Sequence, residues 1–201
     1  MVIEVSEAGK IEIEPIGVIH TPYSAKDFCP EQPVEREEGE SRLEIDARFA
    51  AGLADLEGFR YIYVLAYLQE GKVDAGLKSR PRWARDKEVG LFASRSQHRP
   101  VPIGLSVVRL KRIEGNVLIT SLIDVFDGTP LLDIKPYVAE LDAKADADYG
   151  WIATMDDYRH LLEHARGVPH SHHDHDHDHD HDHDHGHGHG HGHGQGHDQD
   201  E

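Results

Sequence analysis

The chain of 201 residues contains one cysteine, Cys29, so no disulfide can form within it. It also lacks an apolar run near the roughly 20 residues that a membrane-spanning helix needs. The first seven residues lack the basic stretch followed by an apolar stretch that is typical of a signal peptide. These absences predict a cytoplasmic protein with no membrane association.

Basic residues are also scarce, with 21 Lys and Arg against 38 Asp and Glu and a formal net charge of −17. Residues 170–201 carry −9 of this charge, which leaves −8 on residues 1–169. An acidic body argues against a large nucleic-acid footprint, because Lys and Arg supply most nonspecific affinity, although a local basic patch is still compatible with it. The sequence has neither a G-x-G-x-x-G motif nor a P-loop, so a nucleotide-like cofactor would need another kind of site.

Short apolar runs separated by turns predict a mainly β fold, a small β-barrel with a few short helices. The aromatic and β-branched run 61–68 is the strongest strand signal, and 103–113 with 117–125 predicts a hairpin. Further strands are expected at 11–19, 43–45 and 131–134, helices at 47–56 and 156–166, and loops at 20–41 and 70–89.

One segment, Gly90–Gly104, combines two arginines and a histidine with two prolines between apolar ends. Arg95 and Arg99 offer fork-shaped, permanently charged donors. Pro100 and Pro102 stiffen the backbone and favour extended geometry before them. The segment is therefore predicted to be a rigid, cationic ligand loop.

A second segment, Asp124–Tyr137, has a strong turn signal at Asp127-Gly128. It also carries Asp133, Lys135 and Tyr137, which supply an acceptor, a point charge and a phenol. A ligand-binding turn and an ordinary hairpin tip with surface charges both fit this pattern.

Together the two segments closely resemble the TsaA-like (TrmO) family of S-adenosylmethionine-dependent methyltransferases. The family pattern is roughly G-x-F-A-T-R-S-x-x-R-P-N-P-I-G followed by D-x-x-D-G-T-P-x-x-D-I-K-P-Y, and nearly every position is met. The segments Pro15–Tyr23 and Pro30–Pro33 also resemble the family, and the resemblance spans about residues 12–142.

The resemblance implies a small β-barrel rather than a Rossmann methyltransferase, in a homodimer with S-adenosylmethionine near the subunit interface. It implies a barrel domain over residues 1–142, followed by a helical extension over 143–169. The family's best-known activity is N-methylation of threonylcarbamoyl-adenosine next to the tRNA anticodon. The implied cofactor-binding residues are Pro30, Glu31, Gln32, Leu68, Gln69, Arg95, Arg99, Phe126, Asp127, Gly128, Thr129 and Pro130.

The physical chemistry of these residues agrees with that ligand. A methionine carboxylate suits Arg95 or Arg99, and ribose hydroxyls suit Asp127 or Gln32. The sequence identifies no catalytic base. The candidates for catalytic roles are Asp133, Lys135 and Tyr137, and His98 is a further candidate for a base.

The chain departs from the family pattern at Val101, where the family has Asn, and at Gln69, where it often has His. The short 143–169 segment also leaves no room for the extra C-terminal domain of some bacterial members. Three hypotheses follow: a tRNA methyltransferase, a methyltransferase acting on a small molecule in a transition-metal setting, and a non-catalytic metal-storage or sensing protein.

A basic cluster around Trp83 is the best nucleic-acid candidate, because it mixes a stacking ring with phosphate-binding side chains. The alternative is a solvated loop with one apolar anchor. The cluster consists of Arg80, Arg82, Trp83, Arg85 and Lys87.

Residues 170–201 form a His-, Asp- and Gly-rich tail that holds 14 of the 18 histidines. It has almost no apolar residues, so it is expected to be disordered. Neutral imidazoles suit Ni, Zn, Co or Cu, so metal buffering or sensing is predicted beside the alternative of a solvated tail. The proposed ligands are His172, His173, His175, His177, His179, His181, His183, His185, His187, His189, His191 and His193.

Overall fold

The computed structural model describes residues 4–5, 11–24, 29–33, 39–73, 76–84 and 86–165. The chain divides into two units, Met1–Pro169 and His170–Glu201. All described residues belong to the first unit. The predicted metal ligands of the tail and Arg85 of the basic cluster lie outside the described residues.

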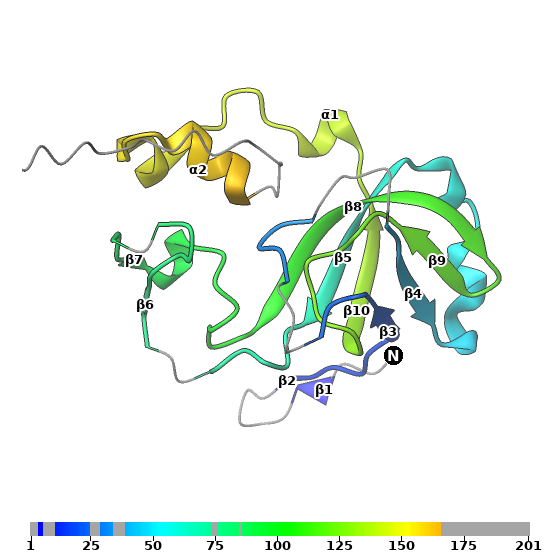
Figure 1. The fold of residues 1–201 in the computed structure, drawn as a ribbon. Helices are drawn as coiled ribbons and strands as arrows, with labels where there is room; N and C mark the ends of the chain where they lie inside the picture. Colours follow the sequence, from blue (N-terminus) through cyan, green and yellow to red (C-terminus); the bar gives the residue numbers. More distant parts are fainter. Residues whose placement is uncertain are drawn as a thin grey trace, which may run out of the picture. The chain divides into compact units, whose positions relative to one another are not determined.

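Among the described residues, six strands form a closed antiparallel barrel in the order β10-β3-β4-β9-β8-β5, with β5 pairing back to β10 (Figure 1). This confirms the predicted fold class. The strands are β3 (Gly17–His20), β4 (Ser41–Ile45), β5 (Tyr61–Tyr67), β8 (Ile103–Glu114), β9 (Val117–Thr120) and β10 (Thr129–Pro136).

Period-two burial builds the core inside this barrel. In β4 the alternate residues Ser41, Leu43 and Ile45 are buried while their neighbours are exposed. Gly17 lets β3 approach β4 closely, because a Cβ there would lie 2.1 Å from the carbonyl oxygen of Glu44. The barrel therefore depends on one glycine at this strand pair.

The remaining elements are short. The expected helix at 47–56 is instead a pair of 3-10 helices, η1 (Ala47–Leu53) and η2 (Leu56–Gly58), separated at Asp55 by a left-handed backbone. The expected strand at 11–19 is interrupted around Pro15, which has no N–H to give to a ladder. The other elements are β1 (Glu4–Val5), β2 (Ile11–Glu12), β6 (Lys78–Ser79), β7 (Val89–Gly90), η3 (Leu91–Ala93), α1 (Ala139–Asp142), η4 (Gly150–Thr154) and α2 (Tyr158–Ala165).

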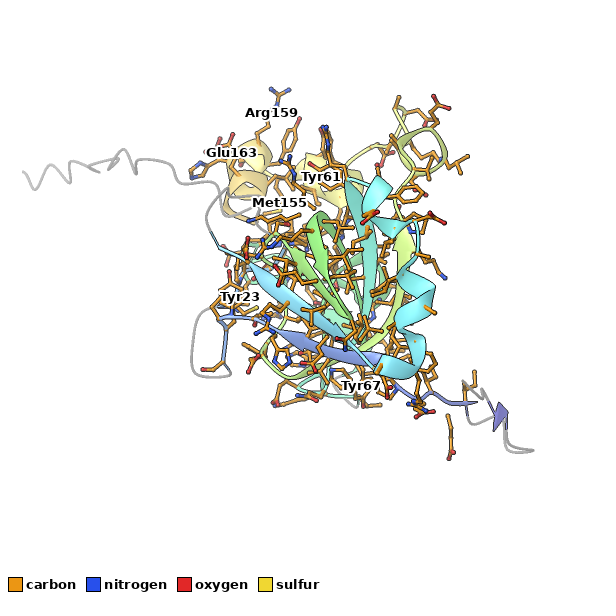
Figure 2. All side chains as sticks on the ribbon, turned by 90° about the vertical axis from the view of Figure 1, so that its right-hand side faces the viewer. Tyr23, Tyr61, Tyr67, Met155, Arg159 and Glu163 are labelled. Atoms are coloured by element: carbon orange, nitrogen blue, oxygen red, sulfur yellow. The ribbon has the colours of Figure 1, made fainter. Side chains whose placement is uncertain are left out.

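Strand register brings three strand ends together. Leu131 of β10 pairs with Ala66 of β5, and Ala66 pairs in turn with Gly104 of β8. The start of β10, the end of β5 and the start of β8 therefore meet at one end of the barrel. Tyr61 and Tyr67 lie at opposite ends of β5 (Figure 2).

No helix in the described part of the chain is both long and apolar enough to cross a membrane.

Candidate functional site

The segment 90–104, called here the signature loop, is held in shape by its own side chains. The Ser94 hydroxyl donates to the carbonyl of Leu91 at 2.8 Å. Arg99 donates to the carbonyl of Ser96 at 3.4 Å, and its guanidinium lies 6.0 Å from the centroid of the Phe92 ring. Arg99 therefore stabilises the loop from within.

The signature loop docks on the chain that leaves β5. The Leu68 amide donates to the carbonyl of Pro102 at 2.8 Å, and the Lys72 amide donates to His98 Nδ1 at 3.1 Å. Gly71 lies between them, and a Cβ there would be 2.5 Å from the carbonyl oxygen of Gln97. The contact is close enough that a side chain at position 71 would displace the loop.

Arg95 extends from the signature loop to residues 29–33, called here the Pro30 loop. Its guanidinium donates to the side-chain carbonyl of Gln32. In the same loop, partly buried Glu31 lies 3.5 Å from the Arg82 guanidinium. Burial raises the pKa of Glu31, and Arg82 partly offsets that effect. Three of the predicted cofactor residues are thus neighbours.

Asp124 lies where these loops meet the barrel. The Ser106 hydroxyl of β8 donates to Asp124 Oδ1 at 2.5 Å, and Ser106 itself is buried. Burial raises the pKa of Asp124 to about 6, although the Ser106 hydrogen bond and the Arg95 charge lower it. Burial and the nearby Asp124 carboxylate raise the pKa of Cys29 to about 11, so its thiol stays protonated at neutral pH.

The Asp127 turn, residues 126–130, is tied to β3 through its backbone. The Asp127 amide donates to Tyr23 O at 2.7 Å, and the Gly128 amide donates to Ile19 O at 2.9 Å. Gly128 has φ +78°, which favours glycine. Asp127 Oδ1 accepts from the Thr21 amide at 3.2 Å and lies 3.3 Å from the His20 ring.

The proposed catalytic residues are Asp133 and Lys135 of β10 and Tyr137, which directly follows that strand. Asp133 and Lys135 form an ion pair at 2.6 Å and alternate with Ile134, which packs against the core. The Tyr137 ring packs on Tyr63 at a centroid distance of 5.4 Å, near the start of β5. Within one chain Lys135 and Tyr137 therefore lie toward the start of β5, away from the signature loop, whereas Asp133 pairs with Leu65 nearer to it.

The described members of the basic cluster are partly engaged. Arg80 pairs with Glu88 at 3.1 Å, and Glu88 also pairs with Lys78, outside the cluster, at 2.6 Å. The Trp83 ring stacks on the ring of Trp151 in η4 with a centroid distance of 5.5 Å, so Trp151 covers one face of Trp83. The other described members of the cluster are Arg82 and Lys87, and Lys87 is half-buried.

Four residues of this region, Asp124, Ser106, Gly71 and Trp151, are not singled out by sequence reasoning. Asp124 has one signal, a lone acid in an otherwise apolar stretch, and it opens the second motif. No sequence signal marks the role of Trp151, because its indole N–H donates to Ala93 O, 58 positions away in the sequence, at 2.8 Å. Within the described ranges no three His, Cys, Asp or Glu side chains are grouped to hold a metal ion.

Comparison with known proteins identifies relatives of this chain. Residues 18–143 match the model of the tRNA-methyltransferase O N-terminal domain. A probable S-adenosyl-L-methionine-binding protein of Pyrococcus abyssi is 40% identical over 152 residues, covering 76% of this chain and 80% of the relative. The human tRNA (adenine(37)-N6)-methyltransferase is 35% identical and matches over 68% of this chain but 32% of its own length.

Solved structures are similar to this chain as well. The crystal structure of TrmO from Pseudomonas aeruginosa is 37% identical, with a TM-score of 0.60, over 72% of this chain and 63% of that one. The chain thus spans less than two thirds of this structure and about a third of the human relative.

The barrel and these relatives define a class of proteins, built without a Rossmann fold, whose members are named for S-adenosyl-L-methionine binding or for tRNA methylation. The chain belongs to the tRNA-methyltransferase O N-terminal domain family, as the resemblance of its two motifs predicts.

Proposed function

We propose that this protein transfers the methyl group of S-adenosylmethionine to the exocyclic nitrogen of the adenosine beside the tRNA anticodon. The expected substrate form of that nucleoside is threonylcarbamoyl-adenosine. The observation that carries the proposal is the meeting of the signature loop, the Pro30 loop and Asp124 at one site, in a family whose relatives bear the names of tRNA methyltransferases.

The residues present fit such a methyl donor. Arg95 lies exposed at the site and offers a charge-assisted bond to the methionine carboxylate. Gln32 and Asp127 offer amide and carboxylate groups to the ribose, and Leu68, Phe126 and Pro130 offer apolar walls. Arg99 supports the loop rather than reaching out of it. S-adenosylmethionine supplies an electrophilic methyl group, so the protein's main task is to align the acceptor with it.

The test is a transfer assay with labelled S-adenosylmethionine and total tRNA at low salt, followed by nucleoside mass spectrometry. We expect label on an adenosine carrying the threonylcarbamoyl group, and none when tRNA lacking that group is used. A protein that binds the cofactor but leaves tRNA unlabelled would contradict the proposal.

A second candidate is methyl transfer to a smaller acceptor. It is favoured by the basic cluster, where Glu88 pairs with Arg80 and Trp151 covers one face of Trp83. Val101 in the signature loop adds to it, since it is 64% exposed and carries no hydrogen-bonding side chain. A parallel assay on a small-molecule extract distinguishes the two, because only one acceptor pool becomes labelled.

The proposal includes a homodimer. Tyr67, Leu105 and Val107 are exposed apolar side chains on the paired strands β5 and β8, with exposed fractions of 42%, 63% and 39%. An apolar strip of this kind on a barrel wall is typical of a subunit interface. A dimer would also give Lys135 of β10 and the following Tyr137 a route to a partner's site.

The proposal divides the chain into a catalytic barrel at 1–142, an extension at 143–169 and a tail at 170–201 that binds transition-metal ions. Imidazole density alone supports this role of the tail. Titration of the full chain with Ni²⁺ or Zn²⁺, beside a chain ending at residue 169, tests it. Equal metal uptake by both chains would contradict metal binding by the tail.

A further inference from the structure

Asp124 is a carboxylate that the proposed cofactor contacts leave unused. It follows β9 and is flanked by Ile123 and Val125, which are 0% and 5% exposed. A carboxylate in such surroundings is costly to keep charged. Its described hydrogen-bond partner from another element is the Ser106 hydroxyl, which donates to Oδ1.

Three segments face this carboxylate. Ser106 comes from β8, and Arg95 of the signature loop acts on Asp124 through its charge. Cys29 of the Pro30 loop is close enough for Asp124 to raise its pKa, and Arg82 acts on the same thiol. Asp124 therefore lies where the segments that surround the proposed methyl donor converge.

No described Lys, Arg or His forms an ion pair with Asp124, so burial dominates and raises its pKa to about 6. The carboxylate is thus ionised at neutral pH yet holds a proton better than an exposed aspartate does. A base with a pKa near the working pH is the most effective proton acceptor.

Other candidates for a base in this region are engaged. His98 Nδ1 accepts from the Lys72 amide, so a neutral His98 carries its proton on Nε2 and has no lone pair free for a second proton. Asp133 accepts from the Ile134 amide at 2.9 Å and pairs with Lys135. Glu31 pairs with Arg82.

We propose that Asp124 is the general base of the reaction and takes the proton of the acceptor nitrogen as the methyl group is transferred. This inference rests on the proposed function. The acceptor's lone pair is delocalised into the conjugated system that carries it, so the nitrogen is a weak nucleophile until its proton leaves. The nitrogen forms a bond to the methyl carbon, the carbon–sulfur pair remains on sulfur, and the N–H proton passes to Asp124 and then to water.

The test compares Asp124→Asn with the wild type over pH 5 to 8. Asparagine keeps the shape and still accepts from Ser106. We expect wild-type kcat/KM to rise with pH and level off above about 6. In Asp124→Asn we expect a loss of about 100-fold or more and no acid limb, with S-adenosylmethionine affinity by calorimetry changed less than about threefold.

Ser106→Ala sharpens the test. The Ser106 hydrogen bond lowers the pKa of Asp124, so its removal should move the acid limb to higher pH while activity on the plateau persists. Glu114→Gln, at an exposed carboxylate of the β8–β9 hairpin, is the matched control and should leave the profile unchanged.

The outcomes separate two failures. If wild type labels its acceptor but Asp124→Asn keeps the acid limb, the inference is overturned while the proposed function stands. If Asp124→Asn loses cofactor binding in parallel with activity, Asp124 is structural and the inference is again overturned. If wild type binds the cofactor but labels neither tRNA nor the extract, the proposed function is contradicted. The inference about Asp124, which rests on that function, is then contradicted too.

Discussion

Single residues at the site show how the barrel changes the chemistry of ordinary side chains. Asp124 and Asp127 are three positions apart, yet Asp124 is partly buried beside Ser106 while Asp127 is exposed and receives a backbone amide. Burial disfavours charge on Asp124, so its pKa rises to about 6. A protein keeps such a costly carboxylate where function benefits from it.

Replacing Asp124 with Asn should therefore stabilise the protein at neutral pH. Between the ordinary pKa of 3.8 and about 6 the folded state binds more protons than the unfolded state, so stability falls as pH rises through this window. At pH 7.5 we expect the free energy of unfolding of Asp124→Asn to exceed that of wild type by up to about 3 kcal/mol. Urea unfolding at pH 7.5 and at pH 4 checks this, and an equal gain at both would contradict it.

At the scale of elements, the site is made of loops that dock on one another. The signature loop meets the chain after β5 through Pro102, Gly71 and His98, and meets the Pro30 loop through Arg95. Backbone groups make several of these contacts, so they leave little room for change. The affinity for the cofactor should depend on this docking as well as on the residues that touch the ligand.

Gly71→Ala should damage the site through sterics alone. Its Cβ would meet Gln97 O at 2.5 Å and Leu68 O at 2.9 Å, and neither backbone atom can move freely. We expect S-adenosylmethionine affinity to fall at least about tenfold and stability by about 1–3 kcal/mol. Gly52→Ala is the matched control, because nothing lies within 4 Å of its Cβ. Calorimetry measures the S-adenosylmethionine affinity of both variants, and thermal unfolding measures their stability. Equal affinities for Gly71→Ala and Gly52→Ala would contradict this prediction.

The segment at 150–165 is tied to the signature loop by Trp151, which stacks on Trp83 and donates to Ala93 O. Trp151→Phe keeps an aromatic ring but loses the donor, and Trp151→Ala loses both. We expect destabilisation of about 1 kcal/mol for Phe and about 2–3 kcal/mol for Ala. Thermal unfolding checks the order, and an Ala variant as stable as wild type would show that the contact is dispensable.

At the scale of the whole molecule, the barrel wall carries an apolar strip that one chain leaves exposed. Leu105 of β8 pairs with Leu65 of β5, and Val107 pairs with Tyr63. These neighbours form one continuous outer face. The proposed homodimer would bury that face.

Leu105→Asp should therefore convert a dimer into monomers, because burying an unpaired carboxylate in an apolar interface is costly. Leu141→Asp, at a residue of α1 that is 71% exposed, should leave the assembly unchanged. Light scattering after gel filtration gives the mass of each variant. A wild type that is monomeric at micromolar concentration would refute the dimer.

Much of the fold could be predicted from the sequence because local patterns encode it. The aromatic run at β5 and the Gly115-Asn116 turn between β8 and β9 carry period-two and turn signals that need no tertiary context. The pair of 3-10 helices was harder to predict, because a left-handed Asp55 between two short glycine-containing segments has no strong sequence signal.

The sequence by itself determined the mainly β class, the two motifs that place the chain in its family and the composition of the histidine-rich tail. Only the tertiary structure decided which polar groups meet. Asp124 reaches Ser106 across 18 positions and Arg95 reaches Gln32 across 63, distances that barrel closure and loop docking set. Burial then raises the pKa of Asp124, and burial is a property of the folded chain.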